Sequence, residues 1–335
     1  MQIGIVGAGA IGGSIAAALH RAGHTVELTA RGENLDAIRR SGIHLTGAWG
    51  DHVADVTAHE ALTVRPQLAF VTTKAQDARS AILANADVLR GLPIVVVQNG
   101  LESLDTARSA LPEATWIGAL ALYAASYLSP GAVTITASGQ TFLGADHGAS
   151  DSTLTAALTL ATATLAEAIP ARAITNFRGA QWTKLIINQV NAMPAITGLS
   201  VQETISSPVL LPIVTASMRE AVRTGFALGT RYVSLQGLSN TLLRAFSVAP
   251  ITLGQGLPRL MARRMGDTPN PGSTLQSIRR GQLTEIDYLN GAVVAQAAAA
   301  SRSAPINRTL VELVHEVERA GTFATPEHVA TAVRR

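Results

Sequence analysis

The N-terminal stretch MQIGIVGAGAIGGSIAAALHRAGHTVELTAR, residues 1–31, decides the fold of the first half of the chain. Residues 2–6 form an apolar run typical of a buried parallel strand, and an Ala-rich helix is expected to follow as far as about residue 22. Gly23 ends that helix, and residues 24–30 predict a second strand. Between the first strand and the helix stands Gly7-Ala8-Gly9-Ala10-Ile11-Gly12, the G-x-G-x-x-G pattern in the strand–helix–strand context that dinucleotide binding requires.

The glycines of this loop have separate expected roles. Gly7 permits the tight turn, Gly9 lets the backbone approach a pyrophosphate, and Gly12 lets the helix pack closely on the strand. The helix N-terminus adds free N–H groups and the positive end of the helix dipole, so all six loop residues are expected to line the cofactor. A secretory signal is a poor alternative, because no Lys or Arg precedes Arg21. The segment predicts a Rossmann-type domain in a cytoplasmic protein.

The tip of the second strand distinguishes the two nicotinamide dinucleotides. A protein that prefers NAD(H) carries Asp or Glu there, about 20 residues beyond the glycines, to bind the ribose 2′-OH. Here the tip reads Thr29-Ala30-Arg31, and Glu27 lies further back in the strand. A guanidinium at this position can pair with a 2′-phosphate through two hydrogen bonds, although a solvated loop arginine would give the same pattern. We expect NADP(H) to be preferred over NAD(H).

Length and composition bound the organisation of the chain. At 335 residues it exceeds the usual size of one domain, so we expect two, 1–170 and 171–335, joined near the Pro-containing stretch 169–178.

Apolar residues make up 47% but aromatics only 4%, and the 26 Lys and Arg residues are scattered, so neither nucleic acid nor a membrane is an expected partner. Cysteine is absent and the 8 histidines lack metal-ligand spacing, so no metal site is expected.

Two further strands of the first half end in polar residues. The apolar runs 68–73 and 93–97 are followed by Lys74 and by Asn99. Because the carboxyl ends of strands form the ligand crevice of open α/β sheets, both side chains are expected at the cofactor and substrate mouth. The alternatives are an ordinary surface lysine and an ordinary turn asparagine.

The rest of the first half predicts more β structure. The apolar run 115–125 is expected to form one strand. Residues 131–136 and 140–143 are expected to pair as an antiparallel hairpin across Ser138-Gly139.

The second half is predicted to be helical, and a first polar cluster interrupts its apolar pattern. In residues 181–191, QWTKLIINQVN, the polar residues Lys184, Asn188 and Asn191 recur at spacings of four and three, which puts them on one helix face. An ammonium and two amides on an otherwise buried helix need partners, because burying an unpaired polar group is costly. A lysine that reaches out to solvent beside satisfied amides is the structural alternative.

A second polar cluster lies in residues 273–291. Thr284 can cap a helix that runs on to about residue 300, with Glu285 in its first turn. The helix dipole stabilises a carboxylate at that position, so the local sequence alone explains Glu285 without a functional role.

These motifs together resemble those of the ketopantoate reductase (2-dehydropantoate 2-reductase) family over essentially the whole chain. The matching stretches are GAGAIG (7–12), TTKAQD (72–77), VVVQNG (95–100), WTKLIINQVNA (182–192) and STLQSIRRGQLTEIDYLNG (273–291). The resemblance implies an α/β fold in which a Rossmann domain is followed by an all-helical domain, with NADPH and a 2-oxo acid bound in the cleft between them. It also implies the reduction of ketopantoate to pantoate, a step of pantothenate biosynthesis.

The resemblance assigns substrate and catalytic roles in the second half. Lys184 matches the general acid, and Glu285 matches a glutamate close to the lysine, the cofactor and the substrate. Asn188 matches the amide that holds the substrate, with Asn191 beside it, and Ser273 matches the serine that binds the carboxylate region.

The resemblance also assigns cofactor roles. Arg31 and Lys74 match a basic pair around the 2′-phosphate. Asn99 matches an asparagine beside the nicotinamide that also contacts substrate, and Ala125 and Glu285 join the cofactor-binding set.

Three departures from the family pattern concern the substrate side. Ala192 stands where many members carry a second asparagine, and Ser277 replaces an aspartate. The stretch Leu101-Glu102-Ser103, after Asn99-Gly100, lacks a second glycine that is common in the family. The departures leave open a reductase of the same fold that acts on another 2-oxo acid or on an imine. A non-catalytic NADPH-sensing regulator is the other alternative, but it would not need to keep Lys184 and Glu285. The helical half carries enough apolar surface for a homodimer.

Overall fold

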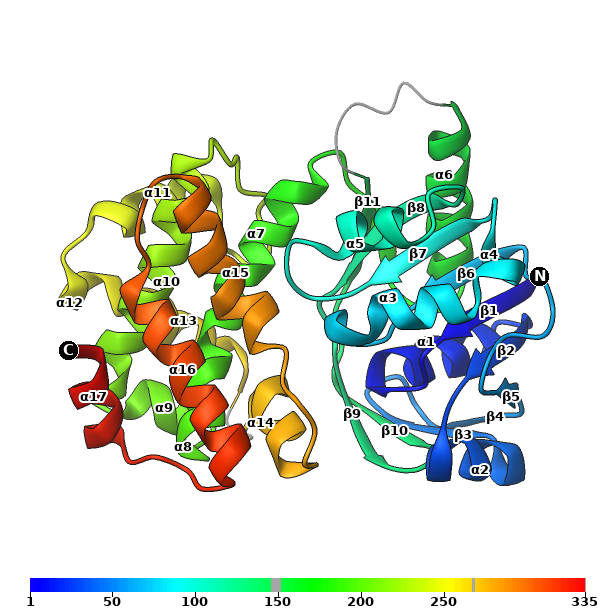
Figure 1. The fold of residues 1–335 in the computed structure, drawn as a ribbon, viewed down its shortest axis with the longest axis horizontal. Coiled ribbons are helices and arrows are strands. Elements are labelled where there is room, and N and C mark those ends of the chain that lie inside the picture. Colours follow the sequence, from blue (N-terminus) through cyan, green and yellow to red (C-terminus); the bar gives the residue numbers. More distant parts are fainter. Residues whose placement is uncertain (146–151, 267–268, 335) are drawn as a thin grey trace. The chain divides into compact units, whose positions relative to one another are not determined.

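The computed structural model describes residues 1–145, 152–266 and 269–334. The chain divides into two compact units, Met1–Arg178 and Gly179–Arg335 (Figure 1). The first unit is mixed α/β and the second is helical, which confirms the predicted fold class. The sequence placed the boundary after residue 170. The division falls later because residues 171–173 form a strand that pairs with residues 141–143 of the first unit.

The strands of the N-terminal unit form two sheets. The main sheet has eight strands in the order β12-β11-β8-β7-β6-β1-β2-β5, and the second has four in the order β4-β3-β10-β9. In chain order the strands are β1 (Gln2–Val6), β2 (Thr25–Thr29), β3 (Ile43–Gly47), β4 (His52–Ala54), β5 (Thr57–His59), β6 (Leu68–Val71), β7 (Pro93–Val97), β8 (Thr115–Ala121), β9 (Ala124–Ser129), β10 (Ala132–Ala137), β11 (Thr141–Gly144) and β12 (Ala171–Ala173).

The centre of the main sheet is parallel. β1 pairs in parallel with β2 on one side and with β6 on the other, and β6 continues to β7 and β8. These strands are continuous apolar runs because both of their faces are covered, and Ile3, Ile5 and Phe70 are fully buried. The order of strands reverses between β1 and β6, which is the switch point where open α/β sheets bind ligands at the carboxyl edge.

The predicted hairpin between residues 131–136 and 140–143 is wrong. β10 pairs with β9 and β3, whereas β11 pairs with β8 and β12. The chain turns instead at Pro130-Gly131, and the predicted single strand 115–125 is split into β8 and β9. At Gly139 the returning chain passes so close to β8 that a Cβ atom would lie 2.3 Å from the carbonyl oxygen of Leu122. Gly139 therefore serves a close backbone approach and not a hairpin turn.

The helices of the N-terminal unit connect strands of the main sheet or lead into the second sheet. They are α1 (Ala10–Arg21), α2 (Gly32–Ser41), α3 (Ala75–Ala84), α4 (Ala86–Leu89), α5 (Ser103–Ala110) and α6 (Ser152–Ala166). α1 packs on β1 and β2 and buries Ile15 and Leu19 completely. Its small residues allow this close packing along most of its length.

The C-terminal unit is built from helices. They are α7 (Phe177–Asn188), which begins two residues before the unit boundary, η1 (Gln189–Asn191), α8 (Ala192–Thr197), α9 (Val201–Ser206), α10 (Leu210–Ala227), α11 (Asn240–Val248), α12 (Ile251–Gly254), α13 (Gly256–Arg264), α14 (Gly272–Arg279), α15 (Ile286–Ala299), α16 (Pro305–Ala320) and α17 (Pro326–Arg334).

The local sequence of α16 shows why these segments are helical. Pro305 stands at the first helical position, and Gly321 ends the helix with a φ of +67°. Between them Leu310, Val314 and Val317 recur at helical spacing and are buried. This apolar stripe packs α16 against α15, its neighbour in Figure 1.

Within the described ranges, no helix is both long and apolar enough to cross a membrane. The same part of the chain holds no group of three or more His, Asp or Glu residues arranged to bind a metal ion.

Candidate functional site

The glycine loop between β1 and α1 has the geometry that a dinucleotide site requires. Gly7 has a φ of +109°, which strains any residue with a side chain. A Cβ atom at Gly12 would lie 1.8 Å from the carbonyl oxygen of Gly7, whereas one at Gly9 would meet no described atom within 4 Å. α1 begins after Gly9 with no acidic residue in its first turn and no capping side chain from the described residues. Its first N–H groups are therefore available to phosphate oxygens.

Three polar side chains from neighbouring elements hold the backbone of this loop. Thr29 Oγ1, at the end of β2, accepts a hydrogen bond from the N–H of Gly7 (2.9 Å). Thr72 Oγ1, directly after β6, donates to the carbonyl oxygen of Gly7 (2.8 Å), and Asn34 Nδ2 of α2 donates to that of Ala8 (3.0 Å). The sequence analysis missed all three. The available signal was a threonine at the end of each strand predicted to flank β1.

Glu27, within β2, and Arg31, just after the end of β2, lie in different environments. Glu27 is 1% exposed, and its carboxylate accepts hydrogen bonds from the N–H groups of Thr63 (2.7 Å) and Val64 (3.0 Å). It therefore holds the chain before β6 and is not available to a ribose. Arg31 is exposed at the N-cap of α2, and its side chain makes no hydrogen bond or ion pair with the residues that the structure describes. An anion can approach it from solvent.

Lys74 and Asn99 both lie at the carboxyl edge of the main sheet. Lys74 is the N-cap residue of α3, just after β6, and Asn99 follows β7; both are half-buried. Gln98 Nε2 donates to the carbonyl oxygen of Thr73 (2.7 Å) and so ties the two strand ends together. Ala125 lies elsewhere, in β9 of the second sheet, where it pairs with β10 and packs half-buried against the core.

In the C-terminal unit, Lys184 and Asn188 lie one turn apart on α7. Both are half-buried, whereas Leu185 and Ile186 between them are buried. The predicted continuous helical face ends there, because α7 stops at Asn188 and η1 carries the chain to Asn191. Pro194 provides the physical reason, since it has no N–H to donate to the carbonyl four residues earlier. Asn191 becomes the N-cap residue of α8 and is also half-buried.

Lys184 and Glu285 form the electrostatic centre of this unit. Burial lowers the pKa of Lys184 to about 8, and the negative charge of Glu285 partly offsets that decrease. Glu285 is the N-cap residue of α15, and its carboxylate does not cap the helix. Thr284, the predicted cap, instead accepts a hydrogen bond from the N–H of Ile286 (3.3 Å). Because the Glu285 carboxylate does not cap α15, it can interact with Lys184.

Ser273 and Asn191 are brought close together by the packing of α14. Ser273 is exposed in the first turn of α14, and Gly272 precedes it. A Cβ atom at Gly272 would lie 2.8 Å from Asn191 Oδ1, so the amide lies directly against the start of this helix. The tertiary structure thus joins the two polar clusters that are some 80 residues apart in the sequence.

A buried network of side chains from α10, α15 and α16 reaches Gln189 of η1, directly after α7, and the sequence analysis missed it. Asn307 Oδ1 accepts hydrogen bonds from Ser217 Oγ and from Asn290 Nδ2, both at 2.9 Å, and Asn307 Nδ2 donates to Glu220 Oε2 (2.7 Å). Ser217 Oγ also lies 3.3 Å from Gln189 Oε1, next to Asn188. The sequence did contain a sign of this network. Asn307 stands at helical spacing before the apolar residues Leu310, Val314 and Val317, at a position where a buried apolar residue would be expected.

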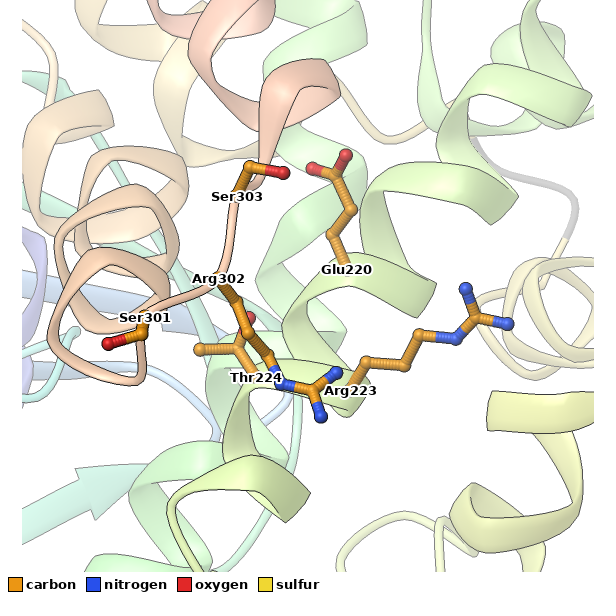
Figure 2. A pocket seen from close by; sticks show the side chains of 6 residues that line it. All are labelled: Glu220, Arg223, Thr224, Ser301, Arg302 and Ser303. Carbon is orange, nitrogen blue, oxygen red and sulfur yellow. The ribbon is translucent and has the colours of Figure 1, made fainter.

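A cavity of about 600 Å³ in the C-terminal unit lies apart from the predicted site residues (Figure 2). It is lined by Glu220, Arg223, Thr224, Ser301, Arg302 and Ser303, beyond the end of α15 opposite to Glu285. The Glu220 carboxylate accepts hydrogen bonds from the N–H groups of Ile306 (3.0 Å) and Asn307 (2.9 Å), and so caps α16. The Arg223 guanidinium points away from the serines in Figure 2 and donates to the carbonyl oxygen of Ser247. No predicted site residue lines this cavity.

The chain is similar to known proteins over almost its whole length. The family models "Ketopantoate reductase PanE/ApbA" and "Ketopantoate reductase PanE/ApbA C terminal" match residues 3–148 and 176–318. A 2-dehydropantoate 2-reductase of Pyrococcus horikoshii is 26% identical over 323 residues, covering 96% of this chain and 99% of the relative. A crystal structure of a PanE/ApbA family ketopantoate reductase from Ralstonia eutropha is 30% identical with a TM-score of 0.79, covering 96% of this chain and 99% of that one. D-mandelate dehydrogenase, in a ternary structure with NADH and anilino(oxo)acetate, shares the fold with a TM-score of 0.78 at 20% identity and the same coverage.

These similarities place the chain in a class of pyridine-nucleotide-dependent oxidoreductases. The two family models and the Ralstonia eutropha structure make the assignment specific. The chain belongs to the ketopantoate reductase (PanE/ApbA) family.

Proposed function

We propose that the protein reduces a 2-oxo acid to the corresponding 2-hydroxy acid with NADPH, and that ketopantoate is the substrate. The observation that carries the proposal is Lys184, whose pKa is lowered to about 8 by burial and partly restored by Glu285. A group with this pKa is protonated at neutral pH and yet is a much better proton donor than an ordinary lysine. The names of the curated relatives, 2-dehydropantoate 2-reductase, support ketopantoate as the substrate.

The residues of the N-terminal unit fit the dinucleotide. The open position at Gly9 and the uncapped first turn of α1 suit a pyrophosphate. The exposed Arg31, together with Lys74, would bind the 2′-phosphate, and the buried Glu27 cannot take a ribose 2′-OH in its place. When bound, NADPH supplies the hydride that the C2 carbon of the substrate accepts. Asn99 would lie beside the nicotinamide, and Ala125 would contact the cofactor from the second sheet.

The residues of the C-terminal unit would perform the proton chemistry and hold the substrate. The Lys184 ammonium donates a hydrogen bond to the C2 carbonyl oxygen and stabilises the negative charge that develops there. It then transfers its proton to that oxygen, so the hydroxyl is completed and the lysine is left neutral until solvent reprotonates it. Glu285 keeps the lysine protonated before the reaction. Asn188, Asn191 and Ser273 would bind the carboxylate and hydroxyl groups and so orient C2.

A second candidate is the same reaction on a bulkier 2-oxo acid. Two observations favour it: Ala192 is a small buried residue directly after Asn191, and D-mandelate dehydrogenase, bound to anilino(oxo)acetate, shares the fold. An imine substrate would use the same lysine. A regulator without activity is the least supported alternative, because it has no need for a lysine of lowered pKa beside a carboxylate.

The experiment that tests the proposal follows NADPH oxidation by its near-ultraviolet absorbance with ketopantoate, and with NADH in parallel. Fast turnover with NADPH and slow turnover with NADH is the expected result. Turnover with phenylglyoxylate in place of ketopantoate would favour the second candidate. Binding of NADPH without turnover of any 2-oxo acid or imine would refute the proposed function.

A further inference from the structure

Three side chains, those of Asp287, His315 and Glu318, lie at the start of α15 next to Glu285, and none of them belongs to the predicted site. Glu318 Oε1 on α16 accepts a hydrogen bond from the N–H of Thr284 (2.7 Å). His315, one turn earlier on α16, places Nδ1 2.7 Å from Glu318 Oε2 and Nε2 3.0 Å from Asp287 Oδ1. The residues on both sides of Glu285 are therefore tied to α16 through one connected set of hydrogen bonds.

The backbone around Glu285 leaves it little freedom within this set. Thr284 and Ile286 are buried, with 6% and 0% exposure, so the residues before and after Glu285 are fixed in the core. Glu285 itself is half-buried and has no capping bond to its own helix. The position of its carboxylate is consequently set by how the segment from Thr284 to Asp287 is held.

The imidazole of His315 can complete both bridges only in its protonated form. A neutral imidazole has one N–H, so one of the two carboxylates would face a ring nitrogen lone pair. Burial alone would lower the pKa of His315, but the hydrogen bonds and charges of Glu318 and Asp287 outweigh it and raise the pKa. Because the folded-state pKa is raised, the stabilisation is complete below the ordinary histidine value of 6.5 and is lost as pH rises through the raised value.

The other elements packed on α16 bring few competing charges to this point. α8 contains no titratable residue, and Glu220 of α10 is bonded at the opposite end of α16, to Ile306 and Asn307. α17 carries Glu327, His328 and Arg334, all exposed. Asp287 and Glu318 are the charges that act on the imidazole.

We propose that His315 and Glu318 are positioning residues for the reaction: they hold the start of α15 so that the Glu285 carboxylate stays beside Lys184. The role rests on the proposed function of Lys184 and Glu285. Its physical basis is that one protonated imidazole joins Asp287, which follows Glu285 by two residues, to Glu318, which binds the N–H of Thr284 directly before Glu285.

The first test compares kcat of His315→Ala with that of the wild type across pH. His328→Ala is the matched control, since it removes an exposed histidine from the same unit. At pH 6 we expect kcat of His315→Ala to fall about tenfold with little change in the KM for NADPH, as for a loss of orientation. The ratio of wild-type kcat to variant kcat should approach one as pH rises, because His315 of the wild type then loses its proton and with it one of its two bridges. A tenfold loss that is equal at every pH, or no loss at all, would contradict the positioning role.

The second test does not depend on activity. The pKa of Lys184 is measured from the pH dependence of its acylation by acetic anhydride, followed by peptide mass spectrometry. In His315→Ala, and in Glu318→Gln if the alanine variant folds poorly, this pKa should fall below the wild-type value because Glu285 moves away. An unchanged Lys184 pKa would overturn the inference. If the wild type reduces no 2-oxo acid, the proposed function fails, while the labelling still decides whether His315 and Glu318 position Glu285.

Discussion

The pH dependence of turnover follows directly from the environment of Lys184. With a pKa of about 8, the lysine loses its proton above that pH, so kcat for reduction should fall about tenfold for each pH unit well above 8. Glu285→Gln removes the negative charge that supports the protonated form while it keeps the size of the side chain. The descending limb of the pH profile should then move toward acid pH.

The size of this movement can be estimated from the charge alone. A carboxylate a few ångströms from an ammonium in partly solvated surroundings contributes about 1 kcal/mol, or about a fivefold change in the ratio of protonated to neutral lysine, which lowers the protonated fraction at pH 8 about threefold. The assay is the rate of NADPH oxidation under saturating substrate between pH 6 and 10. Glu316→Gln, an exposed glutamate on α16, is the control and should leave the profile unchanged. A limb that stays in place or moves toward alkaline pH in Glu285→Gln would refute the reasoning.

Three further predictions concern the N-terminal unit. Arg31→Ala should raise the KM for NADPH at least tenfold and leave that for NADH nearly unchanged, since it removes a charge-assisted pair; an equal effect on both would remove Arg31 from the 2′-phosphate site. Gly12→Ala should lower the free energy of unfolding by about 3 kcal/mol through its clash with the Gly7 carbonyl, whereas Gly9→Ala should melt like the wild type and only weaken dinucleotide binding. Glu27→Ala should cost about 2 kcal/mol in urea unfolding, because the N–H groups of residues 63 and 64 lose their acceptor; wild-type stability would contradict this.

The central strands of the main sheet were predictable because their signals are local, whereas the short outer strands β5 and β12 were not predicted. Continuous apolar runs over β1, β6 and β7, each followed by polar or glycine residues, reflect strands buried on both faces. The second sheet was not predictable in the same way. Gly139 looks like a hairpin glycine in the sequence, and only the approach of Leu122 reveals that it serves a close backbone contact.

The helical unit shows the same difference between local and long-range information. The spacing of Lys184 and Asn188 correctly indicated one half-buried face of α7. The sequence contains Pro194, but it did not show that α7 would end at Asn188. Only the structure shows that η1 follows and that Asn191 therefore leaves the face shared by Lys184 and Asn188. The bridge between α15 and α16 through His315 joins residues 28 positions apart, which no periodicity can indicate.

By itself the sequence determined the dinucleotide loop, the strands that carry it and the identity of the chemical groups, because these depend on glycine conformation and on apolar spacing within a few residues. The tertiary structure decided what those groups do. It buried Glu27 against the backbone of residues 63–64 and left Arg31 exposed. It also brought Glu285 close enough to act on Lys184, although about a hundred residues separate them in the sequence. The pKa of Lys184 depends on its burial and on this neighbouring charge, and both are set by the tertiary structure.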